Sequence, residues 1–111
     1  MIVFPDAKMS KAHNGHAVIE LTENGTWEGF SRFAEAFTNQ LGATKIDGVD
    51  GPDVRFWDIE LDGIPLNLGY DDFPNGMSLM SYSAEGDQLL QRVFEDLKQA
   101  VDTQGDGRQP A

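Results

Sequence analysis

Carboxylates are the side chains whose types and spacing could do chemistry. They form two groups, the adjacent pair Asp71 and Asp72 and the series Asp47, Asp50 and Asp53. Hard divalent cations prefer carboxylate oxygens, so the two groups could in principle share a metal ion. An EF-hand loop starting at Asp47 needs a glutamate at its last position, where Asp58 stands. Because Asp and Gly recur in turns for backbone reasons, we expect a solvated loop, no metal and no cofactor.

The remaining candidates do not indicate catalysis. Neighbouring aspartates on a strand point to opposite faces, so Asp71 and Asp72 make a poor acid–base pair. His13 and His16 flank Asn14-Gly15, and a two-residue turn there would make the two histidines cross-strand neighbours. Two imidazoles without a third ligand do not make a metal site, so we expect an exposed turn. We therefore expect a protein that is not an enzyme.

Composition limits the class of protein. The 111 residues match one domain, and the 40% apolar content excludes a disordered chain. Cysteine is absent, which excludes disulfides, thiolate nucleophiles and zinc sites with sulfur ligands. The first residues show no basic segment followed by a long apolar run, so we expect no secretory signal and a cytoplasmic location.

The charge is strongly negative and uneven. Nineteen acidic residues against eight Lys and Arg give −11, and residues 44–72 hold eight of the acids and two of the bases. This balance opposes binding to nucleic acid and to anionic membrane surfaces. Acidity can serve solubility alone, but a concentrated field also steers a basic protein partner. Among partners, a basic protein is therefore the class that the charge favours.

An amphipathic helix is predicted from Thr26 to Leu41. Its apolar residues recur at helical spacing on one face: Phe30, Phe33, Phe37 and Leu41. Thr26 is the expected N-cap and Gly42 the expected stop. An aromatic stripe of this kind is usually core, so the helix needs a sheet to cover.

Residues 54–70 predict a β-hairpin around the two-residue turn Asp62-Gly63. In that register one side of the hairpin is apolar: Trp57, Ile59, Leu61, Ile64, Leu66 and Leu68. The backbone nitrogen of Pro65 faces away from the first strand, so a third strand can pair only beyond it. The other side carries Asp58 and Glu60 beside Phe56 and Asn67.

Three further elements complete the prediction. They are a strand from His16 to Thr22, a strand from Met77 to Tyr82 after the turn Pro74-Asn75-Gly76, and a helix from Glu85 to Val101. The expected fold is α+β, a two-layer sandwich with an antiparallel sheet of about four strands and two helices on one face. Residues 1–101 would form the single domain, and residues 102–111 a polar, flexible tail.

The sheet side without helices is the expected binding surface, because carboxylates mixed with aromatic residues receive Lys and Arg well. The candidate partner-binding residues lie on this face or lead off the end of the second hairpin strand: Asp58, Glu60, Tyr70, Asp71, Asp72 and Phe73. An idle polar strand end is the competing interpretation of Asp71 and Asp72.

The stretch from Val54 to Leu97 resembles small bacterial immunity proteins of polymorphic-toxin systems, including those of contact-dependent growth inhibition. The likeness rests on a strand followed by Tyr70-Asp71-Asp72, the Pro74-Asn75-Gly76 turn and a closing amphipathic helix. It implies a compact α+β protein that neutralises a cognate toxin, for example a nuclease, by covering its basic surface. The alternative is an accessory or regulatory interaction domain, for example a homodimer that uses the sheet edge beyond Pro65.

Overall fold

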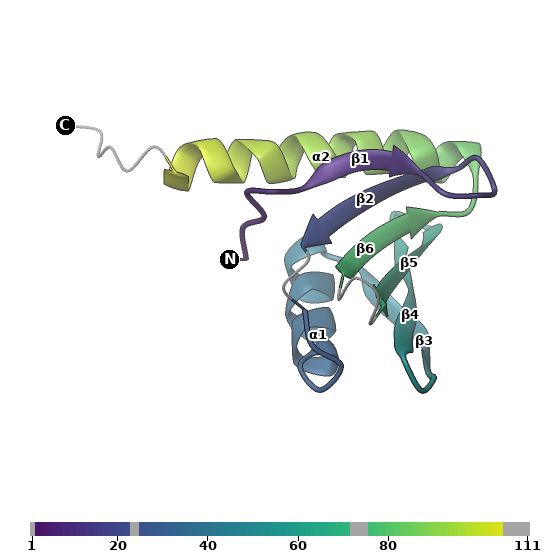
Figure 1. Ribbon diagram of the computed structural model, residues 1–111. Coiled ribbons are helices and arrows are strands. Elements are labelled where there is room, and N and C mark those ends of the chain that lie inside the picture. The colour runs from purple at the N-terminus through teal and green to yellow at the C-terminus, as the bar shows by residue number, and fades with distance from the viewer. Residues whose placement is uncertain (1, 23–24, 72–75, 106–111) are drawn as a thin grey trace.

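The computed structural model describes residues 2–22, 25–71 and 76–105. Six strands and two helices follow one another (Figure 1): β1 (Lys8–Lys11), β2 (Ala17–Thr22), α1 (Phe30–Leu41), β3 (Thr44–Asp50), β4 (Val54–Leu61), β5 (Ile64–Asp71), β6 (Gly76–Ser81) and α2 (Ala84–Gly105).

The strands form one antiparallel sheet in the order β1-β2-β6-β5-β4-β3. The α+β class is confirmed, but the expected count of about four strands was wrong. The two edge strands, β1 and β3, were missed. β3 contains Asp47 and Asp50, so this acidic stretch is a strand and not the predicted loop. All seven residues of β3 are exposed, so its sequence lacks the alternation of apolar and polar residues that would predict a strand.

Both helices pack on one face of the sheet, as predicted, and close a single core (Figure 1). The fully buried side chains come from both layers: Ile19, Leu21, Phe30, Phe37, Ile59, Leu66, Leu68, Leu79, Leu90 and Ser81. Strand residues of the core alternate with residues of the other face, as the pleat requires. That other face carries no helix among the described residues.

The predicted hairpin is confirmed in its register. Leu61 pairs with Ile64, and Asp62 and Gly63 both have positive φ, 54° and 76°, as a two-residue turn of this hand demands. The β5–β6 ladder begins at Leu66, directly beyond Pro65. Because β5 lies between β4 and β6, the edge beyond Pro65 is occupied within the chain and cannot serve a homodimer; the homodimer itself stays a prediction.

Helix α1 begins later than predicted. Its N-cap is Gly29 and not Thr26, whose Oγ1 accepts a hydrogen bond from the Gly29 N–H at 3.0 Å in the turn before the helix. The predicted stop at Gly42 is confirmed by its left-handed φ of 76°. Phe30 and Phe37 are buried as the stripe predicts, while Phe33 and Leu41 pack partly exposed against the core.

Helix α2 ends later than predicted. It continues to Gly105 and extends past the strands (Figure 1), so residues 102–105 are helical and not part of a flexible tail. The rest of the predicted tail, residues 106–111, lies outside the described residues. In the part of the chain that the structure describes, neither helix is long and apolar enough to span a membrane.

A buried arginine ties α1 to the β3–β4 hairpin. Arg55 is 8% exposed, on the helix-facing side of β4. Its Nε donates to Asp50 Oδ1 at 2.7 Å, Nη1 to the Trp27 carbonyl at 2.8 Å and Nη2 to Ser31 Oγ at 2.6 Å. The guanidinium also lies 4.4 Å from the Trp27 ring centroid. A buried charge with this many partners serves as a structural anchor.

A carboxylate fixes the start of α2 against β2. Asp87 accepts hydrogen bonds from the Ala17 N–H at 2.8 Å and from His16 Nδ1 at 3.1 Å. The Ala17 bond first, then those of His16 and Ser81, lower the pKa of Asp87 from 3.8 to about 2. His16 is thus engaged with a carboxylate of α2.

Acid should remove this contribution of Asp87 to stability. Its folded-state pKa lies below its ordinary value, so the contribution is complete above about pH 4 and is lost as the pH falls toward 2. We expect the difference in unfolding free energy between wild type and Asp87→Asn to shrink over that window. Denaturant titrations at several pH values measure it. A difference that stays constant down to pH 2 contradicts the assignment.

Candidate docking face of the sheet

One face of the sheet, the open face, points away from both helices. Strand alternation places these described side chains on it: Lys8, Ser10, Val18, Glu20, Thr44, Asp47, Val49, Phe56, Asp58, Glu60, Asn67, Asp71, Ser78, Met80 and Tyr82. Five carboxylates therefore stand against one ammonium group. Apolar side chains lie among the acids, which is the composition of a surface that receives a basic protein.

A hydrogen-bonded group crosses three strands of the open face. Asp58 Oδ1 accepts from Tyr82 Oη at 2.6 Å and from Asn67 Nδ2 at 3.1 Å. Asp58 lies on β4, Asn67 opposite it on β5, and Tyr82 directly after β6. These two bonds orient the carboxylate of Asp58.

The phenol of Tyr82 stays protonated throughout the physiological range. Partial burial, followed by the hydrogen bond and the negative charge of Asp58, raises the pKa of Tyr82 to about 12. The hydroxyl is therefore a constant donor to Asp58 and is not set up as a general base. The residue remains 46% exposed, so its ring is available as an aromatic contact.

The structure places the predicted binding residues in different environments. Asp58 and Glu60 lie on the open face of β4, and Asp71 lies on the same face at the end of β5. Tyr70 is 3% exposed in the helix-side core, which removes it from the candidate surface and corrects that prediction. Asp72 and Phe73 lie outside the described residues.

The candidate metal ligands are not brought together. The turn between β1 and β2 is longer than two residues, because the Ala12 N–H bonds the His16 carbonyl and the Gly15 N–H bonds the Ala12 carbonyl. His13 is exposed there, apart from the His16 contact with Asp87. Within residues 2–22, 25–71 and 76–105, no three His, Cys, Asp or Glu side chains are placed to hold a metal ion.

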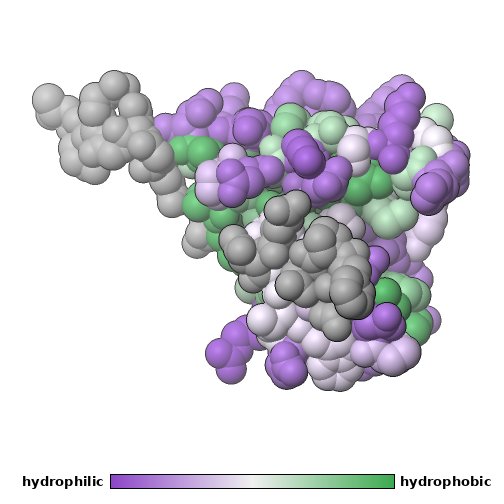
Figure 2. All heavy atoms as spheres, viewed as in Figure 1, coloured by the Kyte–Doolittle hydropathy of each residue, from purple (hydrophilic) through white to green (hydrophobic). Residues whose placement is uncertain are grey.

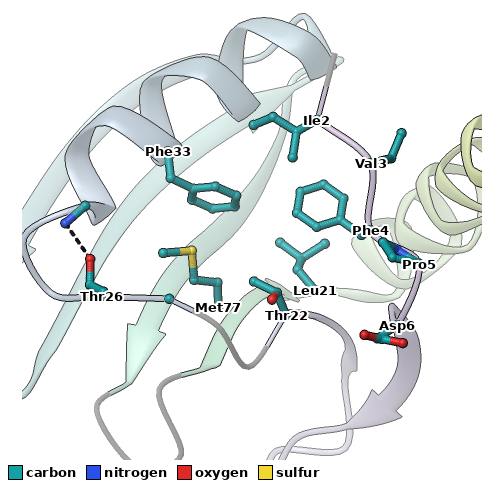
Figure 3. Close-up of a pocket in the computed structure, with 12 residues that line it drawn as sticks. Ile2, Val3, Phe4, Pro5, Asp6, Leu21, Thr22, Thr26, Phe33 and Met77 are labelled. Atoms are coloured by element: carbon teal, nitrogen blue, oxygen red, sulfur yellow. Dashed lines mark hydrogen bonds between the residues drawn. The ribbon is translucent and has the colours of Figure 1, made fainter.

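A separate cavity of about 460 Å³ lies on the helix side, between the N-terminal segment and α1. Figure 3 shows Ile2, Phe4, Phe33, Leu21 and Met77 lining it, so the lining is mainly apolar. Phe4 packs edge-on against Phe33, with the ring centroids 6.0 Å apart. Among the lining residues that the structure describes, Asp6 is the one titratable group, so they offer no acid–base pair and the open face is the stronger candidate.

Sequence reasoning missed two contributors to the open face. Tyr82 shares the face of Met80 two positions earlier, a signal that the alternation already contained. Val49 on β3 is 46% exposed, and only the recognition of β3 as a strand would have placed it opposite Phe56 of β4. In Figure 2 a small group of hydrophobic residues lies among hydrophilic ones on the side of the molecule where Figure 1 draws β3 and β4.

The fold and the open face define a small α+β protein in which no described helix covers one face of the antiparallel sheet. The sequence matches the family described as "Protein of unknown function (DUF3630)" over residues 7–98, and the chain belongs to that family. Comparison with curated proteins and with solved structures returned no match.

Proposed function

We propose that the protein is a non-enzymatic binding protein whose open face docks a basic protein partner. The observation that carries the proposal is the sheet face that no described helix covers, where five carboxylates and one ammonium group of the described residues surround exposed apolar side chains. Opposite charge accelerates encounter, while aromatic contacts such as Tyr82 hold the complex.

The particular role that we propose is that of an immunity protein, which neutralises a cognate toxin in the cytoplasm. A nuclease toxin needs a basic cleft for phosphate, and an acidic face is its electrostatic complement. The net charge of −11 supports this role, as does the resemblance stated above. The test is growth rescue: the chain is co-expressed with the C-terminal domain of the protein encoded immediately upstream.

Survival that depends on the chain is the expected result, and death in its presence contradicts the immunity role. If the upstream domain is not toxic, its direct binding to this chain is measured instead. Failure of that binding also counts against the proposal.

Charge neutralisation on the open face should slow association with that domain. The double variant Asp58→Asn with Glu60→Gln keeps side-chain size and is expected to reduce the association rate about tenfold at low salt. The matched control is Glu95→Gln with Asp96→Asn, which removes the same charge from exposed positions on α2. Stopped-flow binding at two salt concentrations measures both. Equal rates for the two double variants would remove the open face from the interface.

The alternative role is an accessory or regulatory interaction domain that uses the same face. Self-association through the open face is disfavoured, because two copies would bring five carboxylates against five. Light scattering after gel filtration separates a monomer from a homodimer.

A further inference from the structure

The outer edge of β3 is the longer of the two free edges in the sheet. β3 is last in the strand order, and no described strand pairs with its outer side. It has seven residues, whereas the opposite edge strand, β1, has four. Unpaired strand edges are templates for pairing with another chain, and natural proteins protect them when pairing is unwanted.

The register identifies the backbone groups that point outward. In antiparallel pairs, hydrogen-bonded and non-hydrogen-bonded positions alternate, and the turn makes Leu61 and Ile64 a bonded pair. Alternate residues of β4, beginning with Glu60, therefore bond β3. Their partners on β3 are Thr44, Asp47 and Val49. The N–H and C=O groups of Lys45, Gly48 and Asp50 consequently point to the free edge.

One hydrogen bond agrees with this assignment. The Gly48 N–H donates to the side chain of Asp47 at 2.8 Å, as expected for a group that points away from β4. Asp47 thus covers the central outward N–H of the edge with a carboxylate. A carbonyl from an added strand can replace it, which would free the carboxylate of Asp47 for a cation.

The two edges differ in their protection. β1 is short and carries Lys8 and Lys11 at its ends, an arrangement that discourages strand addition. On β3 the single lysine, Lys45, is folded back with its Nζ 4.1 Å from the Trp57 ring centroid. Two of the large exposed hydrophobic residues, Ile46 and Val49, also lie on β3, which leaves this edge apolar and acidic.

We propose that the outer edge of β3 is a strand-addition site for an extended, basic segment of the partner protein. The inference rests on the proposed function and specifies how the partner is held. Backbone hydrogen bonds form at Lys45, Gly48 and Asp50, and the residues of the segment that lie opposite these three are apolar. Basic side chains of the segment meet Asp47 and the adjoining carboxylates of the open face. A second copy of this chain is a poor occupant, because its β3 is acidic as well.

A synthetic peptide tests the edge without the natural partner. The probe is a blocked heptapeptide of alternating lysine and valine, and the control is the same peptide with N-methylated valines, which cannot donate. We expect the first peptide to slow amide hydrogen exchange at Lys45, Gly48 and Asp50 at least tenfold, and the second to have no such effect. Amides of β1 serve as the internal reference. Equal protection by both peptides, or none, overturns the proposal.

A matched pair of variants tests the edge in the chain itself. Lys45→Pro and Lys45→Ala both remove the ammonium group, but only proline removes the outward N–H. We expect Lys45→Pro to weaken binding of the lysine–valine peptide about tenfold and Lys45→Ala to change it less than threefold, with unchanged circular dichroism in both. Equal affinities overturn the proposal, as does a dimer of the free chain that Lys45→Pro dissociates.

The same variants separate this inference from the proposed function. If Lys45→Pro still rescues growth and binds the upstream domain like wild type, strand addition is wrong and docking through the open face stands. If the peptide protects the edge but the upstream domain is neither bound nor neutralised, the immunity role fails and the edge remains a strand-addition site.

Discussion

Replacing Arg55 with leucine is expected to lower the free energy of unfolding by about 3 kcal/mol. The change removes three hydrogen bonds, including the 2.7 Å bond to Asp50, and leaves the Trp27 carbonyl with the longer bond from the Phe30 N–H at 3.4 Å. The Asp50 side chain is 55% exposed and can return to water, which keeps the loss below that of a fully buried pair. Denaturant unfolding measures the effect.

Two controls separate the anchoring role of Arg55 from its charge. Arg55→Lys keeps the positive charge but cannot supply the planar fork that reaches three partners, so we expect it to recover less than half of the loss. Arg92→Leu removes a charge from an exposed position of α2 and should change stability by less than about 0.5 kcal/mol. A fully stable Arg55→Leu variant would show that the hydrogen bonds of Arg55 do not hold α1 in place.

Replacing Phe37 with alanine is expected to cost about 3–5 kcal/mol. Phe37 is fully buried, and its ring lies 5.1 Å from that of Phe4 and 5.7 Å from that of Phe33, measured between centroids. The variant loses apolar burial, opens a cavity beneath α1 and releases the N-terminal segment from an aromatic contact.

The comparison for Phe37 is Phe33→Ala on the same helix, whose side chain is partly exposed. We expect that variant to lose less than half as much stability, because water already reaches its ring. Thermal unfolding of both variants gives the comparison. Equal losses would mean that the N-terminal segment, which contacts both rings, and not burial, determines the cost.

The hairpin and the first helix could be predicted because short-range rules decide them. Asp62-Gly63 supplies the two positive φ values that a two-residue turn needs, and this turn sets every pair between β4 and β5. The phenylalanine stripe of α1 follows from helical spacing alone. From these two elements the α+β class could be predicted, and so could the face of the sheet on which each hairpin residue lies.

Long-range pairing decided what could not be predicted. β3 contains Gly48 and two aspartates and is exposed throughout, so its strand state comes from its pairing with β4 and not from propensity. Tyr70, by contrast, could have been placed correctly from the sequence. It lies two residues after Leu68 on the same strand and therefore on the same, core-facing side. The contact of Tyr82 with Asp58 spans three strands and required the register of β6.

The sheet order also bears on how the chain reaches its native state. The described sheet consists of two locally connected antiparallel units, β1 with β2 and β3 through β6. Within the sheet, these units are joined where β2 pairs with β6. Val18 faces Met80 across that seam, a separation of 62 residues. Closing such a loop costs about 2 kcal/mol more than closing a short hairpin. The pairing of β2 with β6 should therefore form late in folding. The hydrogen bonds from His16 and Ala17 to Asp87 then stabilise it.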